Sequence, residues 1–400
     1  MTAPPQPVLV VGAGPVGLAA ALALRARGLP ATVLEADPAD RVRPGSRALY
    51  VHGETLHRLE RIAPGLGGEL ARHGLVWHTR STRYAGREVF RRSYPPRHRG
   101  GLPPFTSLRQ VDTERLLRDA AKRQDVRIHW DATVETIHVD PDEIRLTTAD
   151  GATFRAGHVI AADGARSAIR RALGIPIVGH RSPRFHVVVD VEQDPDHPYP
   201  AERIFHYHHP GMNGRHVLVI PFAGGVQVDL QCLAGDTEET IATPDRVRHW
   251  LPRVLDPGAT DRILWVSHYH FQQRVAPAFT DPHRRVLLAG EAAHLFAPFG
   301  ARGMNSGIAD ADEAAAAVAA ALADPAGAAA AVERYDTTRR GAAERNRTAA
   351  GRALAHQQAG PVGRLRQRLA AAVAPLAPAA GRWLDEAPYG PRRTGPSGRY

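Results

Sequence analysis

A glycine-rich turn near the start of the sequence constrains the fold of this chain more than any other feature. Val8–Val11 is a short continuous apolar run, which is typical of a strand buried on both faces. Val16–Arg27 follows as an alanine- and leucine-rich helix, and Ala31–Glu35 reads as the next strand. The pattern GxGxxG spans residues 12–17, between the first strand and the helix. We therefore predict a β-α-β unit whose glycine turn binds a dinucleotide.

Each residue of this motif has a physical role. Gly12 permits the tight turn, Gly14 lets the backbone approach a pyrophosphate, and Gly17 allows the helix to pack closely on the sheet. The helix N-terminus supplies amide donors and a favourable dipole. Glu35, at the end of the second strand, can accept hydrogen bonds from ribose hydroxyls. Its negative charge disfavours a 2′-phosphate, so the site suits FAD or NAD better than NADP.

A second strand-to-glycine turn lies far downstream and favours FAD. Val286–Ala289 reads as a buried strand that runs into Gly290 and Glu291, and Glu291 can bind ribityl hydroxyls. The helix that begins near Gly303 would direct its positive end at the N1/O2 edge of a flavin. FAD needs this second turn because its isoalloxazine lies far from its adenine. NAD does not need such an element. An ordinary α/β turn followed by a core helix is the alternative.

A third element, Asp163-Gly164, follows the predicted strand Val159–Ala162. By itself it reads as a turn in which Ser167 or Asp163 caps the helix Ala168–Leu173.

The middle of the chain is predicted to consist of strands. In Val226–Cys232 apolar residues alternate with Gln227, Asp229 and Gln231, so the two kinds of side chain occupy opposite faces. The other predicted strands of this region are Phe185–Val191, Arg203–His208 and His216–Phe222. A β-rich domain is therefore inserted into a discontinuous α/β domain.

The three motifs, in this order, resemble those of the group A flavoprotein monooxygenases, the para-hydroxybenzoate hydroxylase-like aromatic hydroxylases. The resemblance covers about residues 7–340. It implies an α/β fold with a discontinuous Rossmann-like FAD-binding domain and an inserted β-sheet substrate domain. We assign residues 1–75, 102–180 and 270–345 to the first and 76–101 and 181–269 to the second. Residues 346–400 would form a C-terminal helix and a Pro/Gly-rich tail, without the extra domain of larger family members.

The resemblance also implies roles for individual residues. Arg47 and Gln110 look like the FAD-contacting arginine and glutamine of the family, and Asp163 looks like the aspartate of its DG motif. Pro298 and Gly300 look like the loop at the reactive edge of the flavin. The segment that would follow this loop and open the next helix contains Gly303, Met304 and Asn305.

One departure is that the family's usual GD motif reads Gly290-Glu291 here. A carboxylate remains, one methylene longer, so we expect FAD to bind with slightly altered geometry.

The resemblance further implies a reaction. Non-covalent FAD, reduced by transiently bound NADH or NADPH, would react with O₂ to give a C4a-hydroperoxyflavin that hydroxylates a phenolic or polyketide-like aromatic substrate. A histidine or tyrosine would help the phenol lose its proton. The candidates, besides Pro298 at the flavin edge, are His206, Tyr207 and His208, with His268, Tyr269 and His270 as further ones. We expect no metal site, because no Cys, Asp or Glu completes a set with the histidines near 206.

Other functions share parts of these signals. A flavin-dependent halogenase needs a lysine in its site, and Lys122, the only lysine, falls in a predicted helix of the cofactor domain. A flavin epoxidase and an isoprenoid-chain reductase share the scaffold and remain alternatives. A basic nucleic-acid-binding protein is a remote one, because the net charge of +10 comes from arginines spread along the sequence.

The remaining expectations concern the setting of the protein. Cys232 is the only cysteine, so no intramolecular disulfide forms and a cytoplasmic location fits best. We expect a monomer or homodimer with no nucleic-acid partner and no stable membrane insertion.

Overall fold

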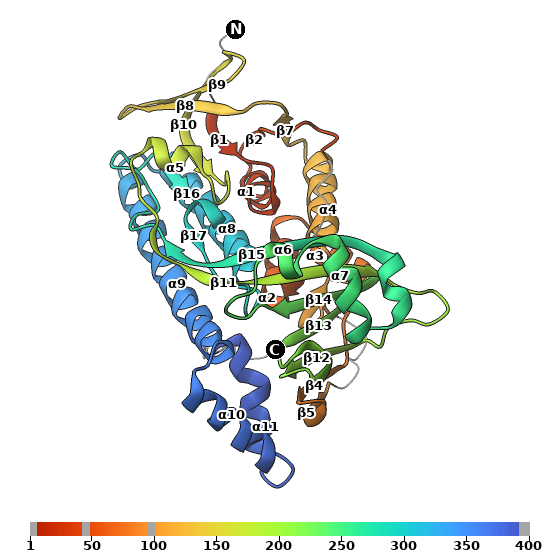
Figure 1. The fold of residues 1–400 in the computed structure, drawn as a ribbon. Helices are drawn as coiled ribbons and strands as arrows, with labels where there is room; N and C mark the ends of the chain where they lie inside the picture. The colour runs from red at the N-terminus through yellow and green to blue at the C-terminus, as the bar shows by residue number, and fades with distance from the viewer. Residues whose placement is uncertain (1–5, 42–48, 95–100, 392–400) are drawn as a thin grey trace.

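The computed structural model describes residues 6–41, 49–94 and 101–391, and everything below concerns these residues. They form two large sheets, one small ribbon and eleven α-helices (Figure 1). The two large sheets occupy opposite parts of the molecule, and the functional cavity described below lies between them.

The first large sheet has the order β7-β2-β1-β10-β9-β8, with β16 beside β10. Strands β7, β2, β1, β10 and β16 are parallel, so their carboxyl ends meet at one edge. Helix α1 packs between α4 and α8. The strands are β1 Gln6–Val11, β2 Thr32–Leu34, β7 Arg127–His129, β8 Val134–Val139, β9 Ile144–Thr148, β10 Thr153–Ala161 and β16 Val286–Leu288. The helices are α1 Pro15–Arg25, α4 Gln110–Arg123 and α8 Arg302–Ala323.

The second large sheet has the order β17-β15-β11-β14-β13-β12-β4-β5. Its members are β4 Thr79–Tyr84, β5 Arg87–Ser93, β11 Val178–Glu192, β12 Glu202–Tyr207, β13 Val217–Phe222, β14 Gly225–Gln231, β15 Ile263–Val275 and β17 His294–Leu295. The short strand β17 comes from the cofactor part of the chain and pairs with β15, which ties the two parts together.

The two faces of this second sheet differ, as the alternation in β14 predicts. Val226, Val228 and Leu230 pack in an apolar cluster that includes residues of α6 Glu238–Ile241 and α7 Pro244–Trp250. Gln227 and Asp229 project to the other face and line the cavity. The polar face of the strand is thus buried against the cofactor part of the molecule instead of facing bulk water.

The C-terminal helices run from the first sheet to the far end of the second (Figure 1). They are α9 Ala328–Gln357, α10 Pro361–Val373 and α11 Pro378–Glu386. The expected boundary at residue 345 falls inside α9, which continues without a break. Helix α11 packs on β4 and β5, whose hairpin turns at Ala85 and Gly86.

The remaining elements connect the two sheets. They are the ribbon of β3 Tyr50–His52 and β6 Phe105–Ser107, together with α2 Gly53–Ile62, α3 Leu66–His73 and α5 Ala168–Ala172. We did not predict α2 and α3. Helix α5 is capped as expected by two side chains. Ser167 Oγ accepts a hydrogen bond from the amide of Arg170, and Asp163 Oδ2 accepts one from the amide of Ile169.

A buried carboxylate joins α8, α9 and the turn after β16. Asp310 is fully buried, and it accepts the amide of Gly290 at 3.0 Å, Nε2 of His294 at 2.6 Å and Nε of Arg339 at 2.6 Å. Burial alone would raise the pKa of Asp310, but its interactions with His294 and Arg339 outweigh this effect and lower the pKa. The ionised carboxylate therefore stabilises the folded state.

We expect Asp310→Ala to lower the free energy of unfolding by about 3–5 kcal/mol, because the buried guanidinium of Arg339 loses its counter-charge. Urea unfolding near neutral pH measures this change. The difference between the two proteins should shrink as the pH falls through the depressed pKa of Asp310, since the contribution is present only above it.

Glu88→Ala is the matched control, because Glu88 and Arg91 form an exposed pair at 3.1 Å. Its expected effect is about 0–1 kcal/mol. Equal effects of the two substitutions would contradict a structural role for Asp310.

Candidate functional site

A large cavity lies between the carboxyl edge of the first sheet and the polar face of the second. Its volume is about 2460 Å³, whereas pockets for drug-sized ligands measure about 300–1,000 Å³. Its walls include Gly12 and Gly14 at one end and Arg203 and Asp229 on the second sheet. The cavity therefore has room for a large cofactor together with a second molecule.

The first glycine turn is built as the sequence predicts. Gly12 has φ +100°, a conformation that favours glycine. A Cβ on Gly17 would lie 1.8 Å from the carbonyl oxygen of Gly12, so the helix begins directly against the turn. A Cβ on Gly14 would meet nothing within 4 Å, and Gly14 lines the cavity. Since no side chain caps α1, its first amides are free to bind an anion.

Glu35 lies at the same end of the cavity, and its carboxylate is held in place. It accepts the amides of Ala13 and Asp37 and pairs with Arg41 at 2.8 Å. Burial raises the pKa of Glu35, but the two backbone amides and Arg41 act more strongly together and lower it. The ionised carboxylate is oriented to accept further hydrogen bonds, as the predicted ribose contact requires.

The other two motifs reach the same region. Asp163 lines the cavity, and its Oδ1 is buried without a hydrogen-bond partner among the described residues. Gly290 has φ +62° and packs against Val16 of α1, where a Cβ would lie 2.9 Å from a valine methyl. Gly290 is thus a packing residue, while the neighbouring Glu291 lines the cavity.

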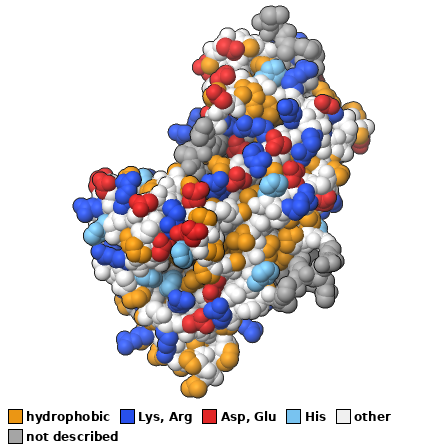
Figure 2. Space-filling model, turned by 90° about the vertical axis from the view of Figure 1, so that its right-hand side faces the viewer, with side chains coloured by type: hydrophobic (Ala, Val, Ile, Leu, Met, Phe, Trp, Pro, Cys, Tyr) orange, Lys and Arg blue, Asp and Glu red, His pale blue; other side chains and the backbone are white. Residues whose placement is uncertain are grey.

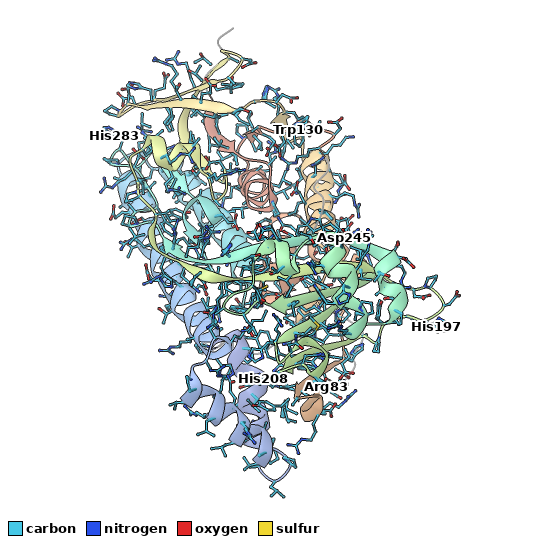
Figure 3. The ribbon with its side chains drawn as sticks, viewed as in Figure 1. Arg83, Trp130, His197, His208, Asp245 and His283 are labelled. Atoms are coloured by element: carbon cyan, nitrogen blue, oxygen red, sulfur yellow. The ribbon has the colours of Figure 1, made fainter. Side chains whose placement is uncertain are left out.

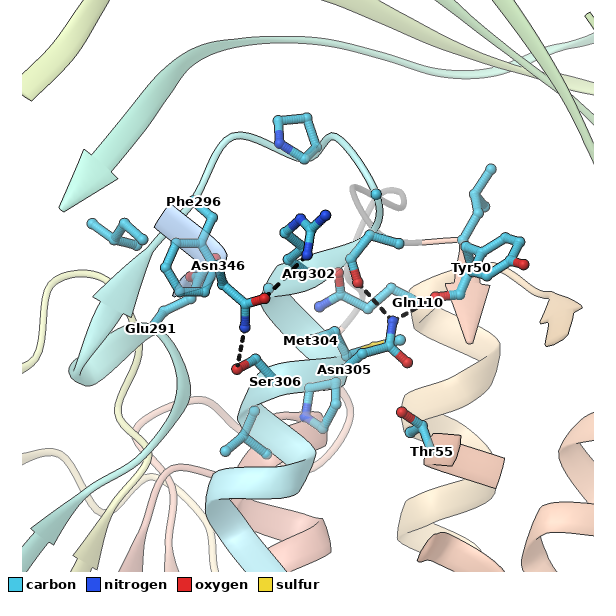
Figure 4. Close-up of a pocket in the computed structure, with 18 of the residues that line it drawn as sticks. Tyr50, Thr55, Gln110, Glu291, Phe296, Arg302, Met304, Asn305, Ser306 and Asn346 are labelled. Carbon is cyan, nitrogen blue, oxygen red and sulfur yellow. Dashed lines mark hydrogen bonds between the residues drawn. The ribbon is translucent and has the colours of Figure 1, made fainter. Parts of the chain in front are cut away.

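The loop before α8 forms the central wall of the cavity (Figure 4). Asn305 holds it to β3, since its Nδ2 donates to the carbonyls of Tyr50 and Ala301 at 2.8 Å and its Oδ1 accepts the amide of His52 at 2.9 Å. Burial lowers the pKa of His52 to about 4. Its neutral ring therefore donates through Nε2 to the carbonyl of Gly300, at 3.1 Å.

The start of α8 is fixed from the other side by α9. Arg302 Nη1 donates to Asn346, and Asn346 in turn donates to Ser306 (Figure 4). No side chain caps the helix, so its first amides face the cavity region uncapped. The predicted residues Pro298, Gly300, Gly303 and Met304 all line the cavity.

Two further predicted cofactor residues have different outcomes. Gln110, the first residue of α4, lines the cavity. Arg47 lies outside the described residues. The cofactor-binding roles of all these residues stay predictions.

The three candidates at the end of β12 and just beyond it, His206, Tyr207 and His208, do not line the cavity, so the structure does not bring them to the site. His206 alternates to the apolar face of the sheet, where its ring contacts that of His209. The hydroxyl of Tyr207 is 2.7 Å from both His356 and the carbonyl of Leu384, under the C-terminal helices. His208 lies at the same end of the molecule (Figure 3), and its Nδ1 contacts the carbonyl of Gly214.

The further candidates on β15 do line the cavity. Tyr269 donates its hydroxyl hydrogen to Asp229 Oδ2 at 2.8 Å, and Asp229 Oδ1 is bonded to Nδ1 of His186. His268 and His270 instead lie next to Glu238, at 2.9 and 3.7 Å. Tyr269 and Asp229 thus form a hydrogen-bonded pair of titratable groups at the cavity wall, and His186 lies buried behind Asp229.

Sequence reasoning missed several residues of the cavity wall. Tyr50, Trp77 and Phe105 form an aromatic cluster whose ring centroids lie 4.4–5.5 Å apart. Arg203 and Asp229 stand on the polar face of the sheet. The alternation of β14 was the available signal for Asp229, whereas nothing in the sequence marked the aromatic residues as neighbours.

Other observations bear on the rival functions. Lys122 is exposed on α4 and does not line the cavity, so this lysine is not placed for halogenase chemistry. On the face shown in Figure 2, basic and acidic side chains are intermixed, without one continuous basic patch.

Within the described ranges, no helix has both the length and the apolar character needed to cross a membrane.

We expect Gly17→Ala to lower the free energy of unfolding by about 1–3 kcal/mol or more and to abolish flavin retention, because the new methyl group would overlap the Gly12 carbonyl. Urea unfolding and flavin absorbance measure the two effects. Gly351→Ala is the control, since it adds a Cβ in open space within α9. It should stabilise the protein by about 0.5–1 kcal/mol, and a similar gain for Gly17→Ala would refute the close packing.

Comparison with known proteins gives this site a context. The profile of a family described as FAD binding domain matches residues 6–350. The 3-(3-hydroxy-phenyl)propionate/3-hydroxycinnamic acid hydroxylases of Shigella sonnei and Escherichia coli K12 are 28% and 27% identical over 315 residues. The match covers 76% of this chain and 54% of each relative, so the chain spans about half the length of the curated relatives it matches.

Solved structures share the fold. The p-nitrophenol 4-monooxygenase of Pseudomonas putida DLL-E4 superposes with a TM-score of 0.76 at 24% identity, over 98% of this chain and 100% of its own. An aklavinone-11 hydroxylase, solved with FAD and aklavinone, gives a TM-score of 0.74 at 26% identity, over 90% of this chain and 70% of its own. These superpositions confirm the predicted α/β fold with its cofactor and substrate sheets.

Proposed function

This chain belongs to the FAD binding domain family, and on that premise we propose that it is an FAD-dependent monooxygenase. It uses NADH or NADPH and O₂ to hydroxylate an aromatic substrate of the phenolic or polyketide-like class. The observation that carries the proposal is the continuity of the cavity, which joins all three cofactor motifs to the polar face of a substrate sheet. The names of the related hydroxylases support the choice of an aromatic substrate.

The residues present fit FAD. Gly14 leaves open space where a pyrophosphate would approach the backbone, and Glu35 is fixed where a ribose would be bound. Asp163 has an unpartnered buried oxygen on the cavity side. The uncapped start of α8 suits the electron-rich edge of the flavin ring. When bound there, FAD supplies the hydride-accepting and oxygen-activating chemistry of the reaction.

The protein's own part in the chemistry is to orient the aromatic ring, exclude water and move a proton. Phe271 and Phe299 lie 5.0 Å apart between the Tyr269 network and the loop of Pro298, where they keep this part of the cavity apolar. A phenol next to Tyr269 gives its proton to the tyrosine oxygen while the tyrosine proton moves to Asp229. His186 holds Asp229 in position from its other oxygen.

We expect the purified protein to be yellow and to release flavin on heating. Oxidation of NADH or NADPH should accelerate when phenols or polyketide-like aromatics are added, and the product mass should rise by one oxygen. Absorbance spectroscopy and mass spectrometry measure these outcomes. Colourless protein that does not take up FAD would overturn the proposal, and turnover of alkenes alone would reassign the enzyme to epoxidation or chain reduction.

We expect Tyr269→Phe to lower kcat for a weakly acidic phenol by about 10²–10⁴-fold, because proton transfer from the substrate is lost. The defect should shrink at high pH, or with a phenol that is already ionised at neutral pH. Steady-state kinetics over a pH series measure this change.

Tyr199→Phe is the matched control, since Tyr199 also donates to a carboxylate, Asp256, at 2.6 Å but lies outside the cavity wall. It should leave the pH profile unchanged. A Tyr269→Phe defect that is equal for ionised and neutral phenols would exclude the proton-transfer role.

A further inference from the structure

Helix α10 and the turn after it carry a row of exposed aliphatic side chains, which we call the apolar stripe. Its members on the helix are Val362, Leu365, Leu369 and Val373, which are 46–82% exposed. Their spacing of three or four residues places them on one face of the helix. Leu376, in the turn, is 91% exposed and completes the stripe. Five of the eight large hydrophobic side chains that the described residues expose are therefore gathered here, and such a concentration marks an interaction surface.

The opposite side of α10 is fixed to the rest of the protein. Gln367 is buried, and its Nε2 donates to the carbonyl of His356 at 2.8 Å. Ala371 is buried in a cluster with Tyr207, and its carbonyl accepts a hydrogen bond from Arg87 at 2.8 Å. These contacts set the rotation of the helix about its axis, so the apolar stripe faces away from the protein. Helices α10 and α11 project at the lower end of the molecule in Figure 1, and hydrophobic side chains are exposed at this end in Figure 2.

The charge around the apolar stripe is positive. Between Glu344 and Asp385 the sequence contains seven arginines and no acidic residue. By helical spacing, Arg366 falls on one side of the stripe, and Arg364 and Arg368 fall on the other. All three of these side chains are exposed. The stripe is therefore bordered by positive charge on both sides.

The acidic residues that follow in the sequence are already engaged. Asp385 is buried and bonded to Arg80, and the carboxylate of Glu386 lies 4.0 Å from the guanidinium of Arg92. A second copy of the chain would bring the same arginines to this surface, with carboxylates that are already paired. Like charges would meet across such an interface, which disfavours self-association through the stripe.

The composition of the apolar stripe favours a lipid surface over a protein partner. It contains only leucine and valine, whereas the residues that anchor protein interfaces are mostly Trp, Tyr and Arg. An apolar helix face bordered by arginines is typical of helices that lie in the interface of an anionic membrane. Helix α10 has 13 residues, fewer than the about 20 that span a bilayer. It is thus suited to lie on a membrane without crossing it.

We propose that the apolar stripe binds reversibly to the surface of an anionic bilayer. The leucine and valine side chains enter the boundary between headgroups and acyl chains, and Arg364, Arg366 and Arg368 contact the lipid phosphates. This surface lies outside the cavity, so the inference does not depend on the monooxygenase reaction. Tyr389, three residues after α11, lines the cavity. The bound hairpin of α10 and α11 therefore lies next to the part of the cavity wall that Tyr389 forms.

Co-sedimentation of the purified full chain, with FAD added, with sucrose-filled vesicles measures this binding. Vesicles of phosphatidylcholine alone are compared with vesicles of phosphatidylcholine and phosphatidylglycerol in equal amounts. We expect the protein to bind the mixed vesicles at least about tenfold more tightly, because only these carry negative charge. Binding to the mixed vesicles should weaken as the salt concentration is raised.

Two substitutions test the stripe itself. Leu365→Gln combined with Leu369→Gln should weaken binding to the mixed vesicles by roughly 10- to 100-fold, because two leucines are lost from the bilayer contact. Leu264→Gln combined with Leu322→Gln is the matched control, since these leucines are also exposed but lie on β15 and α8. The control should bind as the native protein does. Both double variants should keep the native Tm, because the replaced side chains are exposed.

The arginines are tested separately from the leucines. Arg364→Gln, Arg366→Gln and Arg368→Gln together should weaken binding to the mixed vesicles by roughly 10- to 100-fold. The same triple variant should bind phosphatidylcholine vesicles as weakly as the native protein does, because the stripe is intact.

Each other outcome overturns the proposal. This holds for absence of binding to the mixed vesicles, for equal binding of the native protein to both vesicle types, and for binding that the stripe substitutions leave unchanged. If light scattering shows a dimer that Leu365→Gln with Leu369→Gln converts to a monomer, a second copy covers the stripe and the proposal is wrong. No turnover is measured, so failure of the hydroxylation assay and failure of vesicle binding are independent results.

Discussion

The close approach of main chain to main chain at the carboxyl ends of β1, β10 and β16 is the constraint on which the rest of the structure depends. A Cβ at Gly12 would lie 2.5 Å from the carbonyl oxygen of Ala162, and one at Gly17 would lie 1.8 Å from that of Gly12. Val16 fills the remaining space against Gly290. Because these contacts bring the three strand ends together, the motifs that follow each strand open into one cavity.

Much of this end of the molecule could be predicted because its signals are local. The glycine turn at 12–17, the turn after β16 and the long helix α8 are each encoded by adjacent residues with strong conformational preferences. The alternation in Val226–Cys232 likewise identified two faces of a strand. It did not reveal that the polar face is covered by a second part of the chain, since burial against a distant segment leaves no local mark.

The end of the cavity at the second sheet shows where prediction from sequence fails. His206, Tyr207 and His208 carry suitable chemistry, but the strand turns one of them to the apolar face and the C-terminal helices enclose another. The environment of Arg203 is built from β4, β12, α11 and the residues after it, which are separated by up to about 300 positions in the sequence. Such a site depends on tertiary packing, and no spacing rule describes it.

The two ends of the cavity differ in the atoms that set their shape, so they respond differently to substitution. At the glycine turns the shape is set by backbone atoms, so a neighbouring side chain cannot compensate for a replaced glycine. On the second sheet the shape is set by side chains that project from regular strands, such as Leu218, Ile220 and Gln227. A substitution on the sheet can therefore reshape that end of the cavity while the backbone of the glycine turns stays unchanged.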